Sequence, residues 1–158
     1  MIPILPLLTL SLALTSPVTR GDFAILMWRS LGAVPYDVSA LPFADVSPSD
    51  PCSQAVCWAY DEALVNGTGQ ENFSPDRALT REECAALLRR YDARLHRDTF
   101  FPESAATCND GENISPWADD SLYWACSTGR MAWSDNRLAP AGPVSCEEAV
   151  SYFPELSD

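Results

Sequence analysis

The sequence predicts an all-α protein built from repeated helix-loop-helix units. Three segments open with Thr or Ser followed three positions later by Asp or Glu, at Thr19, Thr80 and Ser145. Such a pair satisfies free backbone groups at the start of a helix. The two intervals between these positions are nearly equal. Units repeated in this way bury their apolar faces against one another, so we expect short helix pairs packed around a shared axis.

The most complete unit covers residues 43–92. Asp50-Pro51 is a favourable helix start, and apolar residues then follow with helical spacing at Val56, Ala59, Tyr60, Ala63 and Leu64. We expect Asn66-Gly67 to end this helix. A hook, Phe73-Ser74-Pro75, then leads to Thr80 and a second helix.

The flanking segments repeat parts of this unit. Residues 17–32 keep only its second half, and residues 114–154 form a degenerate copy. In that copy, Leu138-Ala139-Pro140 stands where the hook would recur. Residues 93–113 are polar and irregular, and we interpret them as an insert between units.

Residues 1–16 leave two interpretations open. They are apolar and contain small residues, as a signal peptide does, but no Lys or Arg precedes the apolar core and two prolines interrupt it. The alternative is the truncated start of a repeat. After this stretch we expect no segment to insert into a membrane.

Charge excludes two classes of partner. The chain holds 22 acidic residues and 10 basic ones, all of them Arg, and its formal net charge is −12. Nucleic-acid binding needs a basic surface, and an anionic membrane also attracts basic segments. We therefore expect neither a nucleic acid nor a membrane surface as the partner.

Six cysteines predict disulfides in an oxidising compartment. None belongs to a Cys-x-x-Cys pair and the chain has one histidine, so the sequence predicts no metal site. Six cysteines allow 15 pairings, and the sequence does not choose among them. The candidates are Cys52, Cys57, Cys84, Cys108, Cys126 and Cys146.

These motifs resemble those of the S-layer homology (SLH) family. The resemblance rests on Phe43-Ala44-Asp45-Val46, on the hook, on Thr80-Arg81-Glu82-Glu83 and on the closing Leu88-Arg89-Arg90. The third unit keeps Trp117-Ala118 but has Cys in place of the motif's Arg, at Cys146. The resemblance implies a pseudo-threefold bundle on a secreted bacterial surface protein that binds cell-wall polysaccharide without a covalent bond. The cysteine count adds the expectation that disulfides staple this bundle.

The resemblance also implies where the glycan binds. Arg20 and Arg81 begin their helices, where free N–H groups and the helix dipole favour an anion, and the guanidinium matches a carboxylate. Gly67 and Gly69 would let a sugar approach the backbone, and we expect the groove around Arg81 and Gly67 to be the one that holds the glycan. Trp117 would stack on a sugar or pack in the core. At Cys146 we expect the third groove to have lost glycan binding.

No enzyme and no cofactor is predicted. The single histidine, His96, lies in a charged helix end, and no nucleophile motif accompanies it. The alternative function is an SLH-like scaffold without glycan binding that contacts other surface proteins.

Overall fold

The computed structural model of the chain describes residues 14–101, 107–118 and 120–156. Helices form the regular structure of these ranges, and no strand occurs among them, which confirms the predicted all-α class. The elements are α1 (Arg20–Ser30), α2 (Ser53–Asp61), α3 (Arg81–Arg94), η3 (Gly111–Asn113), α4 (Ser121–Ser127), α5 (Cys146–Ser151) and η4 (Pro154–Leu156). Residues 1–13, which include most of the candidate signal peptide, lie outside the described ranges.

All three predicted helix starts are confirmed. Thr19 precedes α1 and forms a capping box with Asp22, and Thr80 precedes α3 and forms one with Glu83. Ser145 precedes α5, but only half of the box forms there: its side chain accepts a hydrogen bond from the Glu148 backbone N–H at 3.0 Å. The Glu148 carboxylate is therefore available for another contact.

The predicted limits of the helix now labelled α2 were wrong. Asp50 does not cap it; the Asp50 carboxylate instead accepts a hydrogen bond from the Ser47 N–H at 2.7 Å, and α2 begins after Cys52. The helix ends at Asp61, and Ala63 takes the left-handed conformation with φ 57°. The turn thus precedes Asn66-Gly67, and Gly67 is not the residue that stops the helix.

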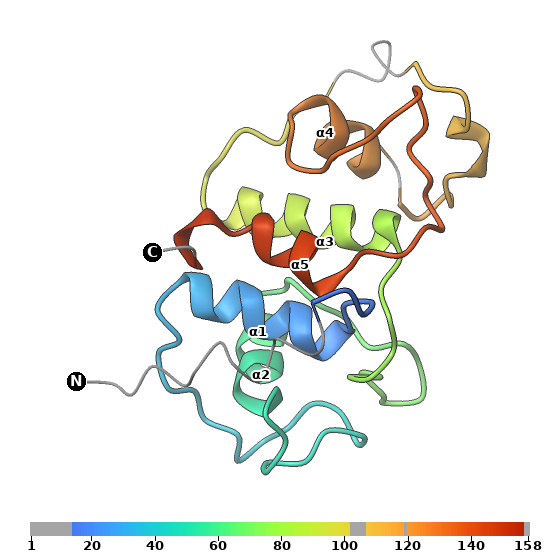
Figure 1. The fold of residues 1–158 in the computed structure, drawn as a ribbon. Helices are drawn as coiled ribbons and strands as arrows, with labels where there is room; N and C mark the ends of the chain where they lie inside the picture. The colour runs from blue at the N-terminus through green and yellow to red at the C-terminus, as the bar shows by residue number, and fades with distance from the viewer. Residues whose placement is uncertain (1–13, 102–106, 119, 157–158) are drawn as a thin grey trace.

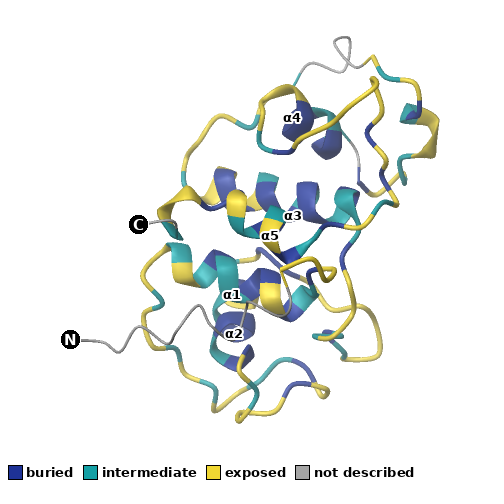
Figure 2. Ribbon diagram, viewed as in Figure 1, coloured by how far each residue is buried: buried dark blue, intermediate teal, exposed yellow. Residues whose placement is uncertain are grey.

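The helices pack in two pairs joined by α5 (Figure 1). Helix α1 packs on α2, and α3 packs on α4. Phe153, two residues after the end of α5, lies edge-on against Phe23 of α1 at 5.6 Å and against Tyr91 of α3 at 5.4 Å between ring centroids. Every labelled helix carries buried residues, whereas the connecting loops include long exposed stretches (Figure 2).

Three short segments meet where the capped helices begin. Residues 17–19, 78–80 and 143–145 pair with one another through isolated bridges, so that each segment contacts the other two. The Val18 N–H donates to the Val144 carbonyl at 2.8 Å, and the Leu79 N–H donates to the Val18 carbonyl at 2.9 Å. These three central residues are almost fully buried. The junction fixes the relative positions of the three helix N-termini.

Two loops carry the same hydrogen bonds, one in the middle unit and one in the third. The Asp45 carboxylate accepts from the N–H groups of Phe73 and Ser74, both at 2.7 Å. The Asp110 carboxylate accepts from those of Leu138 and Ala139, both at 2.8 Å. Ser74 and Ala139 are both left-handed, with φ of 58° and 49°. Each hook is thus held by a carboxylate from an earlier loop. The aspartate lies 28 residues before the first residue of its hook in both units.

The predicted disulfide staples are absent from the structure. All six cysteines are free thiols, and five of them are buried. Several make other contacts: the Cys108 thiol hydrogen bonds with the Tyr123 hydroxyl at 3.1 Å, and the Cys126 sulfur accepts from Arg81 at 3.6 Å. The thiols therefore act as small apolar side chains of the core, a common role for buried cysteine.

Candidate functional site

Arg20 begins α1 and reaches across to the loop of the middle unit. Its Nε donates to the Phe73 carbonyl at 2.8 Å and its Nη2 donates to the Asn66 carbonyl at 2.7 Å. The guanidinium lies 4.6 Å from the centre of the Phe73 ring. These contacts fix the plane of the guanidinium. Among the described residues no acceptor contacts Nη1, so this nitrogen still has donors available for a ligand.

A groove of about 710 Å³ opens beside Arg20. Its remaining lining comes from the loop after α2, from the segment between the hook and α3, from α3 and from the third unit. The lining residues are Arg20, Asn66, Gly67, Thr68, Arg77, Glu83, Ala86, Leu87, Arg90 and Trp117. Three arginines and one carboxylate line a groove in a chain of net charge −12. The groove is therefore a local positive site on an acidic protein.

Burial and neighbouring charged groups shift the pKa values of two residues that line the groove, Arg20 and Glu83. Burial lowers the pKa of Arg20, and the nearby Arg77 lowers this pKa further. Burial acts to raise the pKa of Glu83, but hydrogen bonds from Arg77 and from the Thr80 N–H outweigh it, so this pKa is lowered overall. Arg77 Nη2 lies 2.6 Å from the Glu83 carboxylate. At neutral pH Glu83 is thus ionised and engaged, and Arg20 remains charged.

Trp117 forms an exposed apolar wall of the groove. Its side chain is 57% exposed, unlike Trp124, which is buried in the core. The segment that leads into Trp117 is held by the buried Glu82 carboxylate. This carboxylate accepts hydrogen bonds from the Ser115 N–H at 2.9 Å and from the Ser115 hydroxyl at 2.8 Å. An exposed indole held beside cationic groups offers a flat face on which an apolar face of a ring can stack.

Gly67 lines the groove, but protein atoms fill the space that its side chain would take. A Cβ atom there would lie 2.9 Å from the Asn72 carbonyl oxygen and 3.0 Å from the Phe43 ring. Gly69 has φ 114° and no atom within 4 Å of such a Cβ, and it is not among the residues that line the groove. Gly67 thus permits packing of the loop, and Gly69 permits its turn.

Arg81 lies at a second, separate place. It begins α3, and its Nε donates to the Leu138 carbonyl at 2.8 Å while its Nη2 donates to the Ala132 carbonyl at 2.6 Å. Its Nη1 contacts the Glu148 carboxylate at 3.2 Å, and the side chain is 11% exposed. We expected Arg81 to share a groove with Gly67, but Arg20 takes that position.

The sequence-based reasoning therefore missed Arg77, Arg90 and Glu82. Arg77 lies two residues after the hook and Arg90 closes the Leu-Arg-Arg motif, so both stood in or beside the segments that carried the resemblance. Arg77 and Arg90 line the groove together with Trp117, which the fold brings to α3 from a different unit. The spacing of residues in the sequence does not reveal this packing.

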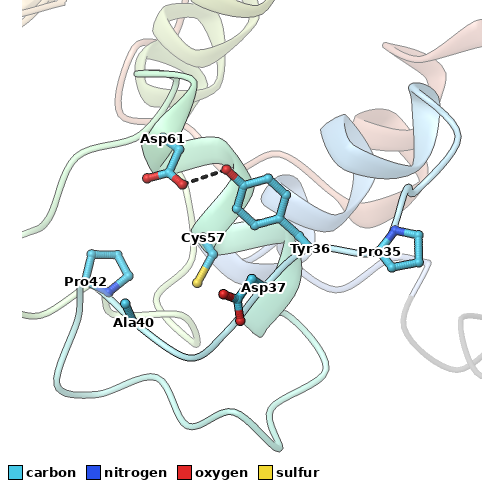
Figure 3. A pocket seen from close by; sticks show the side chains of 7 residues that line it. All are labelled: Pro35, Tyr36, Asp37, Ala40, Pro42, Cys57 and Asp61. Carbon is cyan, nitrogen blue, oxygen red and sulfur yellow. Dashed lines mark hydrogen bonds between the residues drawn. The ribbon is translucent and has the colours of Figure 1, made fainter.

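A second cavity of about 420 Å³ lies between the loop after α1 and helix α2 (Figure 3). Within it the Tyr36 hydroxyl donates to the Asp61 carboxylate at 2.6 Å, and this bond raises the pKa of Tyr36 to about 12. Burial raises the pKa of the Cys57 thiol, so the thiol is not an activated nucleophile. Of the residues predicted from the sequence, only the disulfide candidate Cys57 falls in this cavity. In the described ranges no three His, Cys, Asp or Glu side chains are grouped as metal ligands.

Residues 42–85 match the S-layer homology domain family. The match spans α2, the hook and the start of α3, and so it includes the loop that holds Arg20. This part of the chain is therefore an S-layer homology domain, and the resemblance noted in the sequence is confirmed for residues 42–85.

Three relatives illustrate this kinship. An endoglucanase of Bacillus sp. strain KSM-635 is 30% identical over 70% of this chain, and an amylopullulanase of Thermoanaerobacterium thermosulfurigenes is 30% identical over 86%. A cellulosome-anchoring protein of Acetivibrio thermocellus is 21% identical over 86% of the chain. The matches cover 12%, 7% and 31% of these proteins, so the chain spans only a small part of their lengths.

The S-layer homology domain and the surface-anchoring relatives indicate a location at the bacterial cell surface. Within the part of the chain that the structure describes, no helix has the length and apolar character needed to cross a membrane.

Proposed function

We propose that this chain attaches to the bacterial cell wall by binding an anionic wall polysaccharide in the groove beside Arg20. The observation that carries the proposal is the lining of this groove: the three cations Arg20, Arg77 and Arg90 share it with the exposed Trp117. A carboxylate on a sugar would meet the fixed guanidinium of Arg20, and the sugar ring would stack on the indole.

The repeated contacts support a three-unit arrangement for this function. The junction of residues 17–19, 78–80 and 143–145 relates three capped helices, as a pseudo-threefold bundle requires. Asp110 takes the hydrogen bonds that Asp45 makes in the middle unit. We therefore propose that the third unit begins near Cys108, inside the segment that the sequence had suggested as an insert.

The chain contributes attachment, and catalysis resides elsewhere in those relatives that are enzymes. The endoglucanase and the amylopullulanase match over 12% and 7% of their lengths. A module that attaches to a wall polymer holds whatever is joined to it at the cell surface. Other surface proteins are then neighbours of the module, and its own ligand is the polysaccharide.

Sedimentation with purified cell-wall sacculi tests this function. We expect the wild type to sediment with intact sacculi and to stay in solution when the non-peptidoglycan polymer has been stripped by acid. Arg20→Ala should sediment poorly with both. Arg29→Ala is the matched control, because Arg29 is an exposed arginine at the other end of α1, and it should behave as the wild type.

The contrary result is equally clear. If the wild type and Arg20→Ala sediment equally with intact and with stripped walls, the groove does not anchor the chain. The scaffold function, in which the domain contacts other surface proteins without glycan, would then be the better account.

A further inference from the structure

Arg20 and Arg81 each reach from one unit to the next, and their guanidinium groups are held by the same hydrogen bonds. They differ in the partner of one nitrogen, Nη1. Arg20 and Arg81 each donate from Nε to a hook carbonyl and from Nη2 to a carbonyl of the loop before that hook. Among the described residues nothing accepts from Nη1 of Arg20, whereas Nη1 of Arg81 contacts the Glu148 carboxylate at 3.2 Å. The position of an expected anionic ligand is thus filled at Arg81 by a side chain of the protein.

Glu148 has a counterpart beside Arg20, and the counterpart points elsewhere. Glu83 is the third residue of α3, and Glu148 is the third residue of α5. The Glu83 carboxylate accepts from the Thr80 N–H at 2.9 Å and lies 2.6 Å from Arg77. The Glu148 carboxylate has left its own N-cap and instead accepts from Arg81 and, at 2.8 Å, from the Tyr152 hydroxyl.

One difference between the units explains this contrast. Arg77 and Gly142 have the same backbone role, because their carbonyls accept from the N–H groups of Arg20 and Arg81. Arg77 supplies a cation that holds Glu83 beside its own cap. Gly142 supplies none, and Glu148 pairs with Arg81 instead. A carboxylate pairs with a partly buried cation within reach, because leaving either charge unpaired there is costly.

We propose that Glu148 is a built-in carboxylate ligand that blocks the Arg81 site, so that each chain takes one anionic sugar group, at Arg20, and accepts a second only when Glu148 is removed. The expectation of one site in the wild type rests on the proposed function, in which Arg20 binds the polysaccharide. The inference also names the ligand class, since the contact at Arg81 shows that an arginine held in this way accepts a carboxylate.

Calorimetric titration of the full chain with a synthetic methyl glycoside that carries a pyruvate ketal tests the inference. This probe offers one carboxylate on one sugar. We expect the wild type to bind one equivalent, Glu148→Ala to bind two, and Arg20→Ala to bind at least about tenfold more weakly. The double variant Arg20→Ala/Glu148→Ala should regain one equivalent, now at Arg81.

Glu148→Gln guards against loss of folding in the alanine variant. It keeps an acceptor for the Tyr152 hydroxyl and removes the charge that pairs with Arg81. Circular dichroism of each variant shows that it is folded before titration. We expect Arg20→Ala/Glu148→Gln to bind the probe more tightly than Arg20→Ala alone.

The outcomes separate the two proposals. If both double variants fold but bind no better than Arg20→Ala, the blocking role of Glu148 is wrong, even when the wild type binds one equivalent. If the wild type does not bind the probe but Glu148→Ala does, the inference on Glu148 holds and the proposed site at Arg20 fails.

Discussion

At the scale of single residues, the geometry of Arg20 is the feature on which the proposed glycan binding depends. Two of its nitrogens are held by carbonyls, so its plane is fixed before a ligand arrives. The family resemblance, together with its position at a helix start, predicted this arginine as a binding residue. The sequence did not reveal that Phe73, Asn66 and Trp117 would surround Arg20, because these residues come from other units of the chain.

Arg20→Lys should lose most of the affinity for the anionic polymer, even though the charge is kept. A lysine ammonium cannot donate to two carbonyls and a carboxylate in one plane, so we expect affinity to fall by at least about tenfold. Arg29→Lys is the control and should bind as the wild type. Equal binding by Arg20→Lys and wild type would show that the site needs only a positive charge.

Gly67→Ala should lower the free energy of unfolding by about 1–3 kcal/mol through overpacking. The new Cβ would lie 2.9 Å from the Asn72 carbonyl oxygen and 3.0 Å from the Phe43 ring, and both distances are tighter than ordinary contact. Urea denaturation measures the change. In a double variant with Phe43→Leu, the total destabilisation should be less than the sum of the two effects, because the smaller side chain relieves the contact with the ring while the contact with the Asn72 carbonyl remains. Additive effects would mean that Phe43 is not the obstacle.

At the scale of elements, the capped starts of α1, α3 and α5 followed from the sequence, and the limits of α2 did not. Thr19, Thr80 and Ser145 cap their helices because a short polar side chain meets a free backbone N–H one turn on, which is a local effect. The end of α2 depends on Ala63 adopting a left-handed conformation that alanine rarely takes. The packing of the following loop imposes this conformation, so composition could not predict it.

Asp110→Asn and Asp45→Asn should each destabilise the fold by about 1.5–3 kcal/mol, because each carboxylate accepts two backbone N–H bonds from a hook. Asp76→Asn changes an exposed carboxylate just after the hook of the middle unit and should stay within about 0.5 kcal/mol of the wild type. Urea denaturation at pH 7 gives the three values. If Asp110→Asn changed the free energy of unfolding as little as Asp76→Asn, the Asp110 carboxylate would not stabilise the hook.

Stability should fall in acid. Although burial acts to raise the pKa of Asp110, the N–H groups of Leu138 and Ala139 lower it overall, and the pKa of Glu83 is lowered as well. Both groups bind protons more weakly in the native than in the unfolded chain. Their stabilisation is complete above their ordinary pKa values of 3.8 and 4.5, and it is lost as the pH falls below them.

Urea denaturation between pH 7 and pH 2.5 follows this loss. The wild type should lose stability steadily below pH 4, and Asp110→Asn should show a shallower slope because one of the linked groups is gone. A variant slope equal to that of the wild type would show that Asp110 does not contribute to acid sensitivity.

At the scale of the whole molecule, the junction of three segments positions the helices that carry the proposed site. Val18, Leu79 and Val144 are buried at its centre, and the helices that leave it begin with Arg20, Arg81 and Cys146. The repeat spacing predicted helix units that meet around a shared axis, because capping motifs are local and recur in the sequence. The disulfides inferred from the cysteine count are not present, because the core takes the thiols as apolar side chains.

The central claim is that one groove, at Arg20, holds an anionic wall polymer. The most direct measurement is the dissociation constant for polymer released from sacculi, determined for wild type, Arg20→Ala and Arg29→Ala at one salt concentration. Loss of a hydrogen-bonded ion pair predicts a constant about 10–100-fold larger for Arg20→Ala, and a constant within about twofold of wild type for Arg29→Ala. Equal constants for all three proteins would contradict the claim.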